Sequence, residues 1–538
     1  MDTFNYIIVG AGSAGCVLAN RLTADGHHNV LLLEAGGSDA SFWITTPIGY
    51  GRTFYNPKVN WMYETAPDAG LGGRFSYWPR GKVLGGSSSI NAMVYVRGLP
   101  ADFDDWAASG AAGWSWQDVL PYFRKMENNP LGPSDLHGAD GPLNVTDITP
   151  DRHPVCDDYL AACQALGIPV VDDINGAEAE CAGLYHITTR NGRRESTATA
   201  YLRPARNRPN LQIVTGAQAT RLQITEGRAT GVFYRRNGQD HLAQCRGEII
   251  LSAGAVNSPQ ILQLSGIGPG ALLQRLGIDV MHENPAIGAH LQDHLCHDFL
   301  FRARRPTLNN ALYPFLGKLR AGLRYLLTRR GPLSLSLNQG GGFVRSREGL
   351  SQPDIQLYFS PVSYTKAPPR TRPLMNPDPF PGFLLGYSLC RPESRGSIEI
   401  ASADPMQAPL IQPRYLSVEG DLRGMISGWH FIRRLAATEP LASLIEREMK
   451  PGPAFRTESD IVEDIRTRAG SVFHPVSTCR MGSDPRQSVV DADLRVHGVQ
   501  GLRVADAAAF PSVTSGNTNA PVIMLAEKAA DLILESAR

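Results

Sequence analysis

The N-terminal segment shows apolar and polar positions in a strand–helix–strand order. Four apolar residues, Tyr6–Val9, predict a buried strand. The helical pattern that follows has an apolar face formed by Ala14, Val17, Leu18 and Leu22. After Gly26 a second apolar run, Val30–Leu33, ends in the acidic residue Glu34. This order is typical of a parallel βαβ unit.

Later segments predict a second kind of sheet and a C-terminal helix. Residues 354–359 and 397–400 alternate polar and apolar positions, which predicts a half-buried antiparallel sheet. Near the end, a short strand at 502–504 leads into a loop, and Pro521 begins an apolar helix. We expect an α/β fold (α+β overall): a Rossmann-like domain built from discontinuous segments, and a second domain with an antiparallel sheet flanked by helices.

Three glycines stand between the first strand and the first helix. Gly10, Gly12 and Gly15 occupy the positions of the motif G-x-G-x-x-G. The first permits a tight turn, the second lets the backbone approach a pyrophosphate, and the third lets helix and strand pack closely. Glu34 stands where an acid binds ribose hydroxyls. The segment therefore predicts a dinucleotide site, and it does not separate NAD from FAD.

Composition narrows the class of protein. The 538 residues suffice for more than one domain, and Lys plus Arg (52) nearly balance Asp plus Glu (51), so the net charge of +1 gives no indication of nucleic-acid binding. The eight cysteines form no C-x-x-C pair, which predicts reduced, mostly buried thiols and no metal site. No secretory signal or membrane-length apolar run is present, so we expect a cytoplasmic protein.

Several long motifs resemble the glucose–methanol–choline (GMC) oxidoreductase family. Residues 80–106, RGKVLGGSSSINAMVYVRGLPADFDDW, match its first signature, and residues 254–268, GAVNSPQILQLSGIG, match its second. Shorter matches lie at 288–294, 391–398, 474–482 and 515–531. The resemblance covers the whole chain and is nearest to the choline dehydrogenase and aliphatic-alcohol dehydrogenase branch.

The resemblance implies FAD as the cofactor. Some relatives carry a histidine at the position of Ile90 that binds the flavin covalently, so we expect non-covalent FAD here. The residues expected to bind it are Gly10, Gly12, Ser13, Ala14, Gly15, Glu34, Ala35, Trp61, Arg80, Gly81, Val83, Gly86, Ser87, Asn91, Ala92, Met93, Val94, Ala219, Ala253, Gly254, Asp506, Ala507 and Asn519.

The resemblance also implies a catalytic pair, His474 and Asn517. Alcohol oxidation needs a base for the hydroxyl proton, and a neutral imidazole suits this task near neutral pH. Asn517 cannot act as a base, so its expected role is to hold the substrate oxygen. His290 and His294 are interpreted as structural residues near the domain junction. The start of the C-terminal helix is expected to face the flavin, and a plain docking helix is the alternative.

The scattered FAD motifs suggest a division of the chain into two domains. We assign 1–155, 197–300 and 465–538 to the FAD-binding domain, and 156–196 and 301–464 to the substrate-binding domain. Residues 313–330 form a basic amphipathic pattern. We interpret them as a helix packed on its own sheet; the alternative is peripheral contact with the inner face of a membrane.

The expected reaction is oxidation of an alcohol, primary by preference, to an aldehyde, with a quinone or another non-oxygen acceptor as the second partner. An oxidase that makes hydrogen peroxide is the alternative. The family also includes FAD-containing lyases and a fatty-acid photodecarboxylase, and Cys390 stands where the latter branch has a cysteine. The particular alcohol and the oligomeric state stay open.

Overall fold

The computed structural model describes residues 3–366 and 375–537, and its first elements are the predicted βαβ unit. Strand β1 (Thr3–Val9) runs into helix α1 (Ser13–Leu22), which leads to strand β2 (Val30–Glu34). The predicted apolar face of α1 is fully buried. Each buried leucine or valine contributes about 1.5–3 kcal/mol through removal from water, so this face fixes the helix on the sheet.

In the part of the chain that the structure describes, the strands group into two seven-stranded sheets and six two-stranded pairs. The first sheet contains β1, β2, β10 (Leu211–Thr215), β11 (Ala217–Thr225), β12 (Arg228–Arg236), β13 (Gln239–Leu251) and β26 (Leu502–Val504). The second contains β7 (Cys181–Leu184), β16 (Leu295–Ala303), β17 (Gly340–Val344), β18 (Ile355–Ser360), β21 (Gly382–Leu389), β24 (Ile445–Lys450) and β25 (Gly470–Ser471).

The two-stranded pairs are β3 (Tyr63–Glu64) with β4 (Tyr77–Trp78), β5 (Glu127–Asn128) with β6 (Leu143–Asn144), β8 (Thr189–Arg190) with β9 (Arg193–Arg194), β14 (Ile267–Gly268) with β15 (His282–Glu283), β19 (Tyr364–Lys366) with β20 (Met375–Pro377), and β22 (Ser397–Glu399) with β23 (Leu410–Gln412). The remaining helices are α2 (Phe42–Thr45), α3 (Tyr50–Thr53), α4 (Pro100–Ala108), α5 (Trp116–Met126), α6 (Val155–Ala165), α7 (Arg203–Ala205), α8 (Gly254–Leu264), α9 (Gly270–Arg275), α10 (Leu308–Leu312), α11 (Phe315–Thr328), α12 (Glu419–Ala436), α13 (Leu441–Leu444), α14 (Glu458–Arg468) and α15 (Asn519–Ser536).

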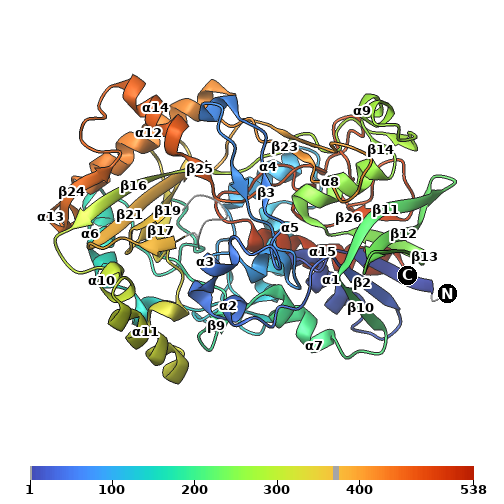
Figure 1. Cartoon of the computed structure of the whole chain (residues 1–538), viewed down its shortest axis with the longest axis horizontal. Helices are drawn as coiled ribbons and strands as arrows, with labels where there is room; N and C mark the ends of the chain where they lie inside the picture. The colour runs from blue at the N-terminus through green and yellow to red at the C-terminus, as the bar shows by residue number, and fades with distance from the viewer. Residues whose placement is uncertain (1–2, 367–374, 538) are drawn as a thin grey trace.

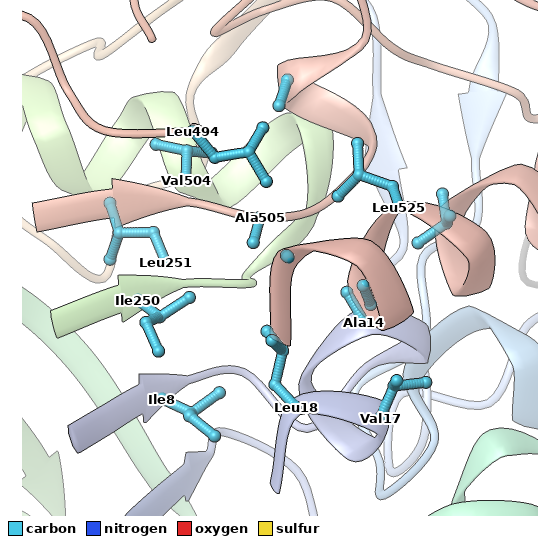
Figure 2. Close-up of a cluster of buried hydrophobic side chains, with 14 of the residues drawn as sticks. Ile8, Ala14, Val17, Leu18, Ile250, Leu251, Leu494, Val504, Ala505 and Leu525 are labelled. Atoms are coloured by element: carbon cyan, nitrogen blue, oxygen red, sulfur yellow. The ribbon is translucent and has the colours of Figure 1, made fainter. Parts of the chain in front are cut away.

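The first sheet is assembled from distant parts of the chain, as the fold class predicted. Strands β10, β2, β1, β13 and β26 run parallel, while β11 and β12 extend β13 as an antiparallel ribbon. Side chains from β1, β13 and β26 pack against α1 and α15 in one buried cluster (Figure 2). This packing places the starts of α1 and α15 at the carboxyl end of the parallel strands, the usual ligand-binding edge of such a sheet.

The second sheet is antiparallel and lies at the opposite end of the molecule from β10 to β13 (Figure 1). The sequence predicted a half-buried strand at 354–359, and this was wrong, because every residue of β18 is buried. One face of β18 packs in the hydrophobic core, and its Tyr358 lines a large internal cavity on the other. The segment 397–400 is half-buried as expected, but its strand β22 pairs only with β23.

Other expectations concern single elements. All eight cysteines are buried free thiols, as predicted. The C-terminal helix α15 begins at Asn519, two residues before the predicted start, with Pro521 in its first turn. Among the described residues, no helix is long and apolar enough to cross a membrane. The predicted division into two domains stays a prediction.

Candidate functional site

The glycine turn after β1 brings three pieces of backbone into close contact. Gly10 has a φ of 101°, and a Cβ atom there would lie 2.6 Å from the carbonyl oxygen of Ser252. A Cβ atom on Gly15 would lie 1.9 Å from the carbonyl oxygen of Gly10, so only glycine allows α1 to approach β1 so closely. Gly12 differs from these two glycines. A Cβ atom built on Gly12 would have Ser252 O as its nearest neighbour, at 3.8 Å, and Gly12 lines the cavity.

Glu34 closes the turn from the end of β2. Its Oε2 accepts the N–H of Ala11 at 2.9 Å, and its Oε1 accepts the N–H of Gly36 at 2.7 Å. Burial raises the pKa of this carboxyl to about 7, and the two N–H donors and Lys82 oppose that rise. The carboxyl lines the cavity, where hydroxyl groups of a ribose would supply further donors.

The segment from Arg80 to Val94 lies against the glycine turn. Gly86, at a φ of 53°, approaches so closely that a Cβ atom there would lie 2.6 Å from the Cα atom of Gly12. Ser87 Oγ accepts the N–H of Gly81 at 3.2 Å, and Asn91 Oδ1 accepts from Arg194 Nη1 at 2.7 Å. These contacts fix the predicted serine-rich loop as one wall of the cavity.

Two helix starts meet at the same wall. Ser13 Oγ, in the first turn of α1, donates to Asn519 Oδ1, in the first turn of α15, at 2.8 Å. The N–H groups of a helix start carry partial positive charge, about half an elementary charge in sum, and favour anions. Asp506 holds the neighbouring loop, since its carboxylate accepts from Gly254 N, Ser258 Oγ and Ala508 N at 2.6–2.8 Å.

His474 lines the same cavity and lies in a constrained loop. The residues Phe473 and Ser477 near it have φ angles of 69° and 71°, a left-handed conformation that costs about 1–2 kcal/mol each. The loop is held because Asp293 Oδ1 accepts the N–H of His474 at 2.6 Å and Arg80 Nη2 donates to the carbonyl oxygen of Phe473 at 2.7 Å. Two polar anchors therefore fix the position of the imidazole.

A chain of hydrogen bonds on one side of His474 sets its tautomer. His294 Nε2 lies 2.9 Å from the carbonyl oxygen of Cys390, which can only accept, so this nitrogen carries the proton. Burial lowers the pKa of His294 to about 4, so the ring is neutral and its Nδ1 is an acceptor. His474 Nδ1, at 2.9 Å from that atom, must then be the donor. The Nε2 atom of neutral His474 is therefore a hydrogen-bond acceptor.

A second chain leads to the same tautomer from the opposite side. Tyr185 donates its hydroxyl hydrogen to the carbonyl oxygen of Leu357 at 2.6 Å and accepts from Gln356 Nε2 at 3.0 Å. Gln356 Nε2 also donates to Asn517 Oδ1 at 3.3 Å, which turns the amide NH₂ group of Asn517 toward His474 Nε2 at 3.2 Å. The acceptor on His474 is again Nε2, and this atom lies beside the amide of Asn517.

Nearly all the predicted site residues line one continuous cavity of about 630 Å³, a size typical of ligand sites. The exceptions are Gly15 and Val83, which are buried behind its wall. The predicted residues that line it are Gly10, Gly12, Ser13, Ala14, Glu34, Ala35, Trp61, Arg80, Gly81, Gly86, Ser87, Asn91, Ala92, Met93, Val94, Ala219, Ala253, Gly254, Asp506, Ala507, Asn519, His474 and Asn517.

Sequence reasoning missed several residues of the site. His294, which was interpreted as a structural residue, contacts His474 directly, whereas His290 does not line the cavity. Gln356, in the strand that was expected to be half-buried, was not singled out. The second sheet and its neighbours also supply lining residues that no motif marked, namely Asp298, Leu337, Asn338, Tyr358, Tyr364 and Val472.

The residues present fit FAD. The open Cβ direction at Gly12 and the paired helix starts suit a pyrophosphate, and Glu34 suits a ribose. The same cavity continues to His474 and Asn517, so a flavin bound to this dinucleotide site would have its ring within reach of both. The side chain of Ile90 at the cavity wall offers no atom for a covalent bond to the ring.

Comparisons with known proteins agree with these observations. The family models for GMC oxidoreductases match residues 4–296 and 392–526. The chain is 42% identical over 535 residues to an alcohol dehydrogenase (acceptor) of Pseudomonas putida, covering 99% of this chain and 96% of that protein. It is 42% identical over 545 residues to the mitochondrial choline dehydrogenase of Homo sapiens, covering 99% and 90%.

Among solved structures, the pyridoxine 4-oxidase from Mesorbium loti superposes with a TM-score of 0.88 at 30% identity and covers 98% of each chain. The relatives and the solved structure therefore match nearly the full length of the sequence, and the family models match most of it. The chain belongs to the GMC oxidoreductase family and is an FAD-dependent member of it.

Proposed function

We propose that this protein oxidises an alcohol to a carbonyl compound, with His474 as the general base. The observation that carries the proposal is the pair of hydrogen-bond chains that leave a lone pair on Nε2 of a neutral, buried imidazole at the cavity wall. The names of the Pseudomonas putida and human relatives, both dehydrogenases of alcohols, support the same chemistry.

The chain's own residues bind, orient and deprotonate the alcohol. His474 Nε2 accepts the hydroxyl proton, and the amide NH₂ of Asn517 donates to the alcohol oxygen and holds the C–H bond in one direction. When bound, FAD would supply the acceptor for the hydride that leaves that carbon. After proton transfer, the Nδ1–H of His474 still donates to His294, so the imidazolium keeps its partner.

The proposed substrate is a primary alcohol, and the proposed acceptor is a quinone or another acceptor than oxygen. The name of the Pseudomonas putida relative, an alcohol dehydrogenase with an unspecified acceptor, is compatible with this proposal. An oxidase is the second candidate, which the likeness to pyridoxine 4-oxidase favours. A photodecarboxylase role for Cys390 gains no support, because its side chain is fully buried and is absent from the cavity lining.

One lining residue favours a particular subclass of alcohols. Asp298 lines the cavity together with Tyr358 and Tyr364, and a carboxylate beside aromatic rings is the combination that binds ammonium groups. We therefore propose that the substrates include cationic alcohols such as choline as well as neutral alcohols. If Asp298 recognises the cation, Asp298→Asn raises KM for choline and leaves KM for an uncharged alcohol unchanged.

A dye-linked assay tests the proposed function. Short, medium, aromatic and quaternary-ammonium alcohols are supplied to the FAD-containing protein, with and without oxygen, while aldehyde, reduced dye and peroxide are measured. Dye reduction without peroxide supports the dehydrogenase, and peroxide in the absence of dye supports the oxidase. Failure to form a carbonyl product from any alcohol would contradict the proposal.

The pH dependence follows from the state of His474. Burial lowers the pKa of His474 well below its ordinary value of 6.5, and the neighbouring His294 and Arg80 lower it further. A base must be deprotonated to act, so kcat/KM is expected to be constant at neutral and alkaline pH and to fall only as pH drops through a value below 6.5. Initial rates between about pH 5 and about pH 9 measure this. An acid limb with a midpoint above 7 is the contrary result.

His294 is expected to act as a positioning residue. In His294→Leu the acceptor for His474 Nδ1–H is lost. The tautomer of His474 that carries its proton on Nε2, and so cannot act as the base, then competes with the active tautomer. We expect kcat to fall at least about tenfold with little change in KM. His294→Gln offers a carbonyl oxygen to His474 and an amide N–H to Cys390, and should restore most of kcat. Equal kcat in both variants would assign His294 a packing role alone.

A further inference from the structure

The leucine face of α11 is exposed, which corrects the expectation that it packs on a sheet. At about 100° per residue, its six apolar side chains occupy an arc of about 120° on the helix surface. Their exposed fractions are unusually high for large apolar groups: Phe315 78%, Leu316 65%, Leu319 55%, Leu323 55%, Leu326 55% and Leu327 77%. Figure 1 shows α11 projecting from the edge of the molecule below α10. We call this face the α11 stripe.

The helix is held by its opposite, narrower face. Ala321 and Tyr325 are its buried residues. Gly317 packs so tightly that a Cβ atom there would lie 2.3 Å from the carbonyl oxygen of Ala311 at the end of α10. The larger apolar side chains are therefore directed away from the protein by the way the helix is anchored, and nothing among the described residues covers them.

Basic side chains border the stripe on both sides. Residues 313–330 contain five basic residues and no acidic one. At about 100° per residue, Arg320 and Arg324 fall beyond one edge of the arc and Lys318 beyond the other. Among the described residues, neither Lys318 nor Arg320 forms an ion pair, whereas Arg324 and Arg330 share Asp151 at 3.2 and 3.9 Å. Most of this positive charge is therefore available to an outside partner.

We infer that the α11 stripe docks on an anionic lipid surface. An apolar arc bordered by Lys and Arg matches the boundary between acyl chains and negatively charged headgroups. The same border disfavours a second copy of this chain as the occupant, because two stripes placed face to face would bring Arg320 and Lys318 of both copies together. The inference goes beyond the proposed function, since it concerns where the enzyme acts rather than what it oxidises.

The stripe is connected to the cavity by a short segment. A 3₁₀ turn, η6 (Pro332–Ser334), contacts α11 on one side and the turn η1 (Pro47–Gly49) on the other. Directly after η6, Leu337 and Asn338 line the cavity. Docking through α11 would thus bring this wall of the cavity near the lipid, a suitable place for an acceptor or alcohol that dissolves in membranes.

Vesicle binding tests the inference with the FAD-containing protein. Co-sedimentation is measured with vesicles of phosphatidylcholine alone and with about 30% phosphatidylglycerol, at about 50 mM and about 500 mM salt. We expect binding to the anionic vesicles that weakens at high salt. Leu319→Glu/Leu323→Glu should weaken it at least about 100-fold, and Lys318→Glu/Arg320→Glu at least about tenfold.

Matched variants separate the stripe from general surface effects. Leu131→Glu/Leu410→Glu changes two leucines that are 53% and 40% exposed elsewhere, and should bind vesicles as the wild type does. Dye-linked turnover of a soluble alcohol should be equal in all variants, which shows that they fold and that a negative result here leaves the proposed oxidation intact. The inference is overturned if the wild type ignores anionic vesicles, or if it forms a dimer that Leu319→Glu/Leu323→Glu dissociates.

Discussion

His474→Ala is expected to lower kcat for alcohol oxidation at least about 100-fold while the purified protein keeps its FAD. The Nε2 atom of His474 is the acceptor that both hydrogen-bond chains present at the cavity wall, and Asn517 beside it has no proton affinity of use. Among the described residues, His474 makes no hydrogen bond to the glycine turn or to Glu34, so its loss leaves the dinucleotide contacts in place.

Flavin absorbance and steady-state rates on the same preparation measure both parts of this prediction. His290→Ala is the matched control, because His290 stands two residues before Gln292, which pairs with Val476 of this loop, and does not line the cavity. Its variant should keep wild-type turnover. Added imidazole should restore part of the lost rate, since it can occupy the space of the deleted ring. A normal rate in His474→Ala would remove His474 from the mechanism.

The dinucleotide end of the site could be predicted because its residues are local. From Gly10 to Glu34, strand, turn, helix and second strand follow one another. Gly10 and Gly15 are required by contacts within that unit or with the segment after the neighbouring strand, whereas Gly12 keeps the cavity wall open. The loop at Gly86 and the helix start at Asn519 could be identified only by resemblance. No spacing in the sequence indicates that a Cβ atom on Gly86 would meet Gly12.

The residues that orient His474 could not be predicted, because their roles arise from contacts across the chain. Gln356 occupies a polar position in an alternating strand, a pattern typical of a solvent-exposed face. That face is buried here, and Gln356 meets Asn517, which is 161 residues away in sequence. His294 likewise meets His474 across 180 residues. Periodicity shows which face of an element is polar, but not what lies opposite it.

The same limit explains the error at α11. The leucine repeat correctly predicts a helix with one apolar face, and the observed helix spans Phe315–Thr328. The expectation that this face packs inward assumed that apolar faces are covered within the chain. In this helix the small residues Gly317 and Ala321 form the packed face instead, because small side chains allow the closest approach to α10 and its neighbours.

Gly12→Val should produce a folded protein without FAD. The backbone of Gly12 is extended, with a φ of −76° and a ψ of −161°, a conformation that valine adopts readily. Its Cβ direction is open within the protein and lies at the cavity wall beside the start of α1. The valine methyl groups would therefore fill the space that a pyrophosphate needs to reach the helix N–H groups.

We expect FAD affinity to fall at least about 100-fold in Gly12→Val, since a rigid side chain at the phosphate turn opposes several hydrogen bonds together. The flavin-to-protein ratio after purification and FAD titration measure this, while circular dichroism verifies the fold.

Gly37→Val is the control for this variant. Gly37 is exposed, a Cβ atom built on it would meet no neighbour within 4 Å, and it does not line the cavity. A ligand that stabilises only the folded state raises Tm, so Gly12→Val should melt like the FAD-free wild type. Full flavin content in Gly12→Val would mean that the cofactor binds elsewhere, and the assignment of the glycine turn would then fail together with the placement of the flavin ring near His474.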